Sequence, residues 1–166
     1  VDKTRKQETE ISILKEQVKP VSKKILKILE KRIYKPRENE FNFGEIKNTD
    51  VYEQVIVPER DKLFRIDIKI ATFARKNNCN LTFSLKNFKN NIVHAESHHS
   101  SEFKDNSFFP IVFQPIDNSQ NEKFYLQISS PDGDYNNALS VYCMSTKNKK
   151  YFLKFNNEEK NCKLVL

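Results

Sequence analysis

An alternating run of apolar and charged residues between positions 63 and 70 is the feature that most limits how this chain can fold. Successive side chains of a β-strand point to opposite faces of its sheet, so this alternation predicts a strand with one buried face and one solvent-exposed face. The residues expected to face inward are Phe64, Ile66, Ile68 and Ile70, and those expected to face outward are Arg65, Asp67 and Lys69. Such a strand is typical of an antiparallel sheet that packs one face on a core.

Short segments with the same period of two recur from residue 51 to the C-terminus, and turns rich in Asn, Asp, Ser and Pro separate them. The expected strands are 51–57, 63–70, 81–85, 92–96, 108–113, 124–129, 139–144, 151–155 and 162–166. This regular spacing is typical of a mainly β module, an antiparallel two-sheet sandwich of the jelly-roll kind, over residues 51–166. The chain has two Gly, so Asn is expected at turn positions that need a positive φ.

The first 33 residues show a different period. Their apolar residues lie three and four positions apart, at Ile11, Leu14, Val18, Val21, Ile25 and Ile28. This spacing predicts a helical stalk over residues 1–33, in which Pro20 either interrupts one helix or begins a second one. The stalk is either a coiled coil that makes a homo-oligomer or a single amphipathic helix packed on the sandwich. Residues 34–50 lose the pattern and are expected to form a linker.

The charge and cysteine content narrow the classes of partner and compartment. The net charge is +7, but the Lys residues are spread along the chain and Arg is rare, which argues against a nucleic-acid interface and leaves acidic polymers open as partners. No apolar run is long enough to span a membrane. Three irregularly spaced Cys fit a reducing cytoplasm. We expect a cytoplasmic piece of a longer protein, with the membrane surface as the alternative location.

Two polar motifs raise the question of a metal. His94, Glu96 and His98 resemble a zincin motif, but Glu96 has the wrong position and the motif requires a helix, so a polar loop with incidental histidines is expected. Asp132 and Asp134 offer oxygen ligands that suit calcium, although the loop lacks the EF-hand pattern. The alternative for this loop is a tight turn without a cofactor, in which Gly133 supplies a positive φ.

No catalytic motif is present: the chain has no GxSxG, no Cys in a catalytic context and no phosphate-binding Gly loop. The chain itself is therefore expected not to be an enzyme. A pair of carboxylates for glycoside hydrolysis has no sequence signature, so a hydrolase on a sandwich scaffold stays as a minor hypothesis.

Several segments together carry a family resemblance. They are residues 51–55, 63–68, 70–77, 105–108 and 113–116, with Ser119, Tyr125, Ser129, Ser130, Asn137 and Ala138. Over about Val51 to Tyr142 the chain resembles the β-sandwich, carbohydrate-binding-module-like accessory domains of bacterial glycosyltransferases and surface-polysaccharide enzymes. Those domains often have Trp where this chain has Phe108 or Tyr142. The resemblance implies a non-catalytic module that binds a glycan or positions a neighbouring glycosyltransferase domain.

The residues expected to bind a ligand lie at turns rather than on strand faces. They are Arg75, Asn77, Asp105, Asn106, Tyr135 and Asn137. Planar guanidinium and amide groups suit bidentate bonds to sugars, but the same groups also fix loops through bonds to the backbone. The competing hypothesis is thus a structural oligomerisation or protein-interaction domain that binds no glycan.

Overall fold

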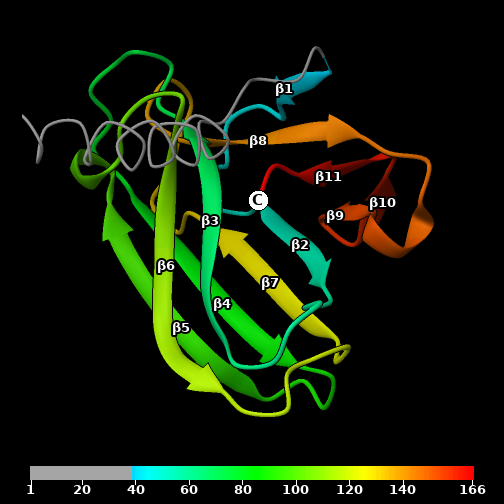
Figure 1. Ribbon diagram of the computed structural model, residues 1–166. Coiled ribbons are helices and arrows are strands. Elements are labelled where there is room, and N and C mark those ends of the chain that lie inside the picture. Colours follow the sequence, from blue (N-terminus) through cyan, green and yellow to red (C-terminus); the bar gives the residue numbers. More distant parts are fainter. Residues whose placement is uncertain (1–38) are drawn as a thin grey trace, which may run out of the picture. The chain divides into compact units, whose positions relative to one another are not determined.

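Eleven strands and two short 3₁₀ helices make up residues 39–166, the part of the chain that this computed structural model describes (Figure 1). The predicted stalk and its coiled coil lie outside these residues. In chain order the elements are β1 (Glu40–Asn42), β2 (Val51–Ile56), β3 (Leu63–Ala71), β4 (Asn80–Asn87), β5 (Ile92–His99), η1 (Ser100–Glu102), β6 (Ser107–Ile116), β7 (Phe124–Ser129), β8 (Ser140–Ser145), η2 (Lys149–Tyr151), β9 (Leu153–Phe155), β10 (Glu158–Lys160) and β11 (Cys162–Leu164).

The strands form two antiparallel sheets, as the alternating pattern predicts. One sheet has the order β1-β8-β3-β6, with β11 also paired to β8, and the other has the order β10-β9-β2-β7-β4-β5. From β2 to β9 the chain crosses to the other sheet at every connection except the β4–β5 hairpin. Figure 1 shows the long strands β3 and β6 of one sheet running across β4, β5 and β7 of the other.

The core fills the space between the two sheets. Ile68 and Ile70 of β3 are fully buried, and so are Leu81 and Phe83 of β4. The Phe83 ring stacks on Phe109 of the opposite sheet, with 6.2 Å between ring centroids. The prediction that the isoleucines of β3 face inward is therefore confirmed. The three cysteines are also buried, and none forms a disulfide.

Two side chains of β3 depart from the simple alternation. Phe64 is 51% exposed, so the prediction that it faces inward is wrong. The pairing with β6 shifts register between Leu63 and Arg65, and Leu63 packs against the core in place of Phe64. A bulge of this kind changes which side chains of a strand face inward. Lys69, expected in solvent, is 5% exposed, and its Nζ lies 3.0 Å from a carboxylate oxygen of Glu40.

Residues within the range expected as a linker also pack with the sandwich. β1 pairs with β8, with Phe41 opposite Cys143. Ile46 is fully buried in the core, and its backbone nitrogen donates to the carbonyl of Leu139 at 2.9 Å. The unit to which the strands belong accordingly extends from Glu38 to Leu166.

Asparagine takes most of the left-handed backbone positions, as its abundance predicts. The asparagines with positive φ are Asn90, Asn106, Asn118, Asn121, Asn136, Asn156 and Asn157. Asn tolerates this conformation better than most residues because its short side chain bonds to nearby backbone. Within residues 39–166, no helix is long and apolar enough to cross a membrane.

Gly133 is required for a different reason from the one expected. Its φ is not positive; in that loop the left-handed residue is Asn136, with φ 60°. A Cβ atom at Gly133 would instead collide with the carbonyl oxygen of Ile46 and would lie 2.6 Å from Ser130 Oγ. The loop between β7 and β8 therefore packs directly on the backbone of the segment after β1.

We expect Gly133→Ala to lower the free energy of unfolding by about 1–3 kcal/mol, because the added methyl group forces backbone apart in a packed region. Urea unfolding followed by circular dichroism measures this. Lys147→Ala, at an exposed position, serves as the control and should unfold like the wild type. Equal stability of Gly133→Ala and wild type would show that the close approach is absent in solution.

Candidate functional site

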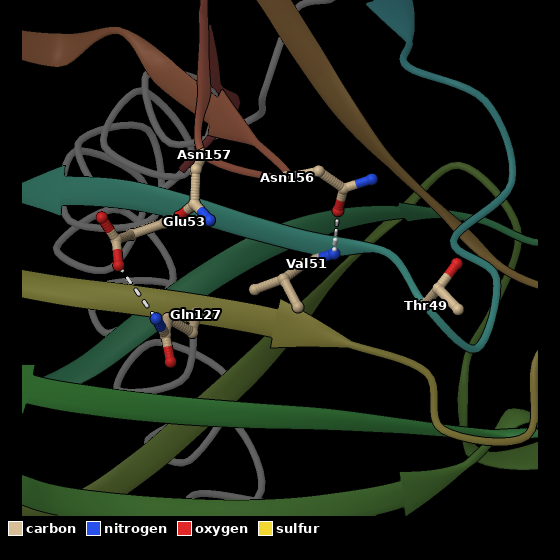
Figure 2. Close-up of a pocket in the computed structure, with 6 residues that line it drawn as sticks. All are labelled: Thr49, Val51, Glu53, Gln127, Asn156 and Asn157. Carbon is tan, nitrogen blue, oxygen red and sulfur yellow. Dashed lines mark hydrogen bonds between the residues drawn. The ribbon is translucent and has the colours of Figure 1, made fainter.

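A pocket of about 370 Å³ opens on the outer face of the six-stranded sheet (Figure 2). Its position follows from the alternation along β2, in which Tyr52 and Gln54 are buried while Val51 and Glu53 point away from the core. The residues that line it are Thr49, Val51, Glu53, Gln127, Asn156 and Asn157. We call this hollow the sheet-face pocket.

A row of polar side chains crosses three strands on this face of the sheet, and two of its members, Glu53 and Gln127, form the floor of the pocket. Glu53 of β2 lies opposite Gln127 of β7 and opposite Lys154 of β9. Gln127 Nε2 donates to Glu53 Oε2 at 2.9 Å, as Figure 2 shows. Lys154 Nζ lies 3.5 Å from Glu53 Oε1. Strand pairing thus holds a carboxylate and an amide side by side.

One wall of the pocket is the turn between β9 and β10. Asn156 and Asn157 both have left-handed backbone, with φ 50° and 68°. Asn156 Oδ1 accepts a hydrogen bond from the Val51 backbone at 2.8 Å, and its Nδ2 donates to Asp50 Oδ1 at 3.1 Å. These two bonds fasten the turn to the start of β2, which places the Asn157 side chain above the sheet (Figure 2).

Part of the hydrogen-bonding capacity of the pocket is unused within the described residues. Neither the Asn157 amide nor the Thr49 hydroxyl makes a side-chain bond there, and Gln127 uses its nitrogen but not its oxygen. Val51, 38% exposed, adds an apolar patch. Such a site can hold a small polar molecule through several hydrogen bonds and one apolar contact.

The ligand residues predicted from sequence lie elsewhere, in loops at one end of the sandwich. Arg75 donates to Asn77 Oδ1 at 2.8 Å and to the Ala138 carbonyl at 3.1 Å, and it also pairs with the Glu45 carboxylate. Asn77 donates to the Thr72 carbonyl at 3.0 Å. Arg75 therefore connects three separate chain segments.

The remaining predicted residues are mostly bonded to neighbouring loops as well. Asp105 accepts a hydrogen bond from the Thr72 backbone at 2.6 Å, and Asn106 accepts one from the Tyr142 hydroxyl. Asn137 bonds both backbone groups of Asn78, at 2.5 and 3.2 Å. Burial alone would raise the pKa of Asp105, but the hydrogen bonds that its carboxylate accepts from Thr72, Ala74 and Asn106 outweigh burial and lower the pKa.

Tyr135 differs from the other predicted residues because it is 72% exposed. A second pocket, of about 360 Å³, also lies at this end of the sandwich. Its lining residues are Thr72, Arg75, Lys76, Asn77, Ser100, Ser101 and Phe103. The structure thus brings Arg75 and Asn77 together beside a hollow, but most of their polar atoms already have partners.

The two aspartates considered for calcium have backbone or side-chain partners. Both carboxylate oxygens of Asp132 accept from Asn80, at 2.7 and 2.6 Å, and Asp134 accepts from the Tyr135 backbone at 2.6 Å. Burial acts to raise the pKa of Asp132, but the bonds from Asn80 lower it overall. These bonds fix the Asp132 carboxylate against the start of β4.

The histidine motif lies on a strand rather than in a polar loop. β5 continues to His99, so the expected loop after Glu96 is not observed. His94, Glu96 and His98 lie opposite Leu85, Phe83 and Leu81 of β4 respectively, and they therefore share the inner face of the sheet with these buried residues. His99 points to the other face, where it contacts Asn78 and Ser101.

These side chains form a linear chain of acids and bases. His94 Nε2 lies 3.1 Å from Glu96 Oε2, His98 Nε2 lies 3.2 Å from Glu96 Oε1, and His98 Nδ1 lies 2.9 Å from Glu102 Oε2. Four residues along a strand span roughly 13 Å, which keeps the two imidazoles on opposite sides of Glu96. Accordingly, the described residues contain no group of three or more His, Cys, Asp or Glu that converges on one ion.

His98 is held between two carboxylates and aromatic rings. Its ring centroid lies 4.7 Å from that of Phe109, on the opposite sheet. Burial acts to lower the pKa of His98, but the hydrogen bonds and charges of Glu102 and Glu96 outweigh it and raise the pKa. The hydrogen bond from His98 in turn lowers the pKa of Glu102. His98 therefore links β5 to η1 through Glu102 and packs on Phe109 of β6.

We expect the contact between His98 and Glu102 to make the stability of the fold depend on pH. The folded pKa of His98 exceeds its usual 6.5, so its contribution is complete below pH 6.5 and is lost as the pH rises through the folded value. Glu102 has the opposite sign: its contribution is present above its usual pKa of 4.5 and is lost as the pH falls through its lowered value. Urea midpoints measured from about pH 6 to about pH 8.5 should therefore fall, and His98→Gln should flatten that fall.

His99→Gln is the matched control, because His99 lies outside the chain of acids and bases and its removal should leave the slope in place. An NMR titration of the His98 ring checks the pKa directly. Parallel pH profiles for wild type and His98→Gln would contradict the assignment.

The sequence did not identify the residues of the sheet-face pocket as a site. Glu53 and Gln127 lie far apart in the chain, and each is an ordinary outward position of a predicted strand. The turn at Asn156 and Asn157 was recognisable, but its place above β2 depends on strand order. The available signal was the alternation of the predicted strands 51–57 and 124–129, which places Glu53 and Gln127 among the outward-facing residues.

No protein-family model matches the sequence, and the search of curated proteins finds no match.

Proposed function

We propose that the sandwich is a non-catalytic glycan-binding module that serves a larger glycosyltransferase or polysaccharide-synthesis protein. The observation that carries the proposal is the sheet-face pocket, where the Glu53 carboxylate and the Gln127 amide lie side by side on neighbouring strands. Planar carboxylate and amide groups suit paired hydrogen bonds to the hydroxyl groups of a sugar ring. The family resemblance over about Val51 to Tyr142 supplies the larger context of the proposal.

The surroundings of the pair support a sugar rather than a strongly apolar ligand. Asn157 and Thr49 extend the polar lining, and Val51 offers the apolar contact that the carbon face of a sugar needs. Within residues 39–166 no aromatic ring lines this pocket, so the proposed binding relies on hydrogen bonds more than on stacking. Weak binding to a single sugar is expected, with affinity gained over a polymer.

Binding is preferred to hydrolysis because of the number of carboxylates. Glycoside hydrolysis generally uses two carboxyl groups on either side of the bond that is cleaved, about 5 to 9.5 Å apart. In the part of the chain that the structure describes, Glu53 is the one carboxylate that lines the sheet-face pocket, and its oxygens contact Gln127 and Lys154. The proposed role is therefore to hold a glycan.

A protein-interaction role is the second candidate, and two exposed apolar residues favour it. Phe64 is 51% exposed and Val112 is 55% exposed. Val112 of β6 pairs with Arg65, the residue after Phe64, so the two apolar side chains lie on adjacent strands of the five-stranded sheet. In this role the sandwich would position a neighbouring glycosyltransferase domain without binding glycan.

Screening the full chain on a glycan array, followed by calorimetry with the best ligands, tests the first candidate. Gln127→Ala and Asn157→Ala should each weaken binding about two- to tenfold, the value of one hydrogen bond. Tyr135→Ala, at the exposed loop, is the control and should bind like the wild type.

A loss of binding in the loop variant, rather than in the pocket variants, would assign glycan binding to the loops. If Tyr135→Ala abolishes binding while both pocket variants bind normally, the sheet-face pocket is not the glycan site. No binding at millimolar concentrations of any sugar would exclude the glycan role and leave the protein-interaction role.

A further inference from the structure

The charge of the sheet-face pocket differs from that of the whole chain. The chain carries a net charge of +7, yet among the described residues no basic side chain lines the pocket, and Glu53 is the charged residue of its lining. Behind the Asn156 wall lies a second carboxylate, Asp50, which accepts from Asn156 Nδ2 at 3.1 Å. Lys154 offsets part of this charge, but its Nζ contacts Glu53 from outside the lining, at 3.5 Å. The charged group that a ligand in the pocket can contact directly is therefore the Glu53 carboxylate.

The hydrogen-bonding groups of the pocket point to the same kind of ligand. Gln127 uses one of its two amide hydrogens on Glu53, which leaves its carbonyl oxygen and the other hydrogen. Glu53 can only accept when ionised. Asn157 and Thr49 can donate or accept. The one group that can only accept is the Glu53 carboxylate, and it favours a ligand that donates hydrogen bonds, as sugar hydroxyl groups do.

We infer that the sheet-face pocket selects neutral sugar units and discriminates against acidic ones, such as uronic acids. This inference rests on the proposed glycan-binding function and names the class of sugar. A sugar carboxylate would replace a hydrogen-bond donor with an acceptor and would place a negative charge near the Glu53 carboxylate. Like charges about 4 Å apart cost about fivefold in affinity even at the dielectric constant of water, and more at a protein surface.

The test compares oligosaccharides that differ only at carbon 6. Suitable pairs are β-1,4-linked mannan and mannuronan fragments, cellulose and glucuronan fragments, and galacturonan fragments with galactan fragments of the same linkage. Calorimetry with the full chain measures each affinity at about 0.02 M and about 0.5 M NaCl, because salt screens the charge effect. We expect a neutral member of at least one pair to bind about fivefold or more tightly than its acidic partner at low salt, with a smaller ratio at high salt.

Glu53→Gln separates charge from shape, since glutamine keeps an oxygen that can accept from Gln127. Whatever it does to the neutral affinity itself, this variant should move the ratio of acidic to neutral affinity about fivefold toward the acidic member, because both members lose the same carboxylate contact and only the acidic one loses the repulsion. Glu59→Gln is the matched control. It makes the same change in net charge in the exposed segment beyond the other end of β2, and it should change neither affinity.

The outcomes distinguish this inference from the function on which it rests. Neutral and acidic sugars that bind equally well, or a ratio of acidic to neutral affinity that Glu53→Gln leaves unchanged, would overturn the selectivity and keep the glycan-binding role. An equal gain in Glu59→Gln would assign the effect to net charge and overturn it as well. Absence of binding by every sugar would overturn the glycan-binding role and the selectivity together.

Discussion

Packing of the two sheets against each other is the constraint on which the other features of the structure depend. Phe83 of β4 stacks on Phe109 of β6 across the core, and Leu81 and Leu85 are buried beside it. Because side chains alternate along a strand, burial of one set fixes the other set outward. The row from Lys154 through Glu53 to Gln127 is therefore a consequence of core packing: a slip of one residue in β2 or β7 would bury one member of the pair.

The inner face of β5 is an exception to this apolar packing. Here Glu96 and His98 occupy positions opposite buried leucine and phenylalanine residues, and burial of charge is costly unless the charges are paired. Pairing along the strand and with Glu102 compensates for that cost, and Phe109 covers the imidazole. β5 is the last strand of its sheet, so the charged chain lies where the sandwich opens. That position gives the carboxylates partial access to water and explains how the cluster is tolerated.

The strands were predictable from sequence because alternation is a local signal. Residues 124–129 form a strand with the predicted bounds, and β3 extends the predicted run by one residue. Other features depend on long-range contacts. The side chains of β1 carry no clear alternation, and Ile46 stands alone among polar residues, so only the packing against β8 and Leu139 reveals their place. Phe64 fits the pattern perfectly and still lies outside, because a bulge is set by the pairing with β6.

The loop residues predicted from sequence and the residues of the sheet-face pocket differ in how their polar side chains are used. Arg75 and Asn137 were recognisable because guanidinium and amide groups at turns have high bonding capacity, and the structure uses that capacity to connect loops. Asn156 does similar work, fastening a turn to the start of β2. Its neighbour Asn157 is held in place by those bonds and keeps its own side chain for solvent. A site built this way is organised before a ligand arrives, so less conformational entropy is lost on binding.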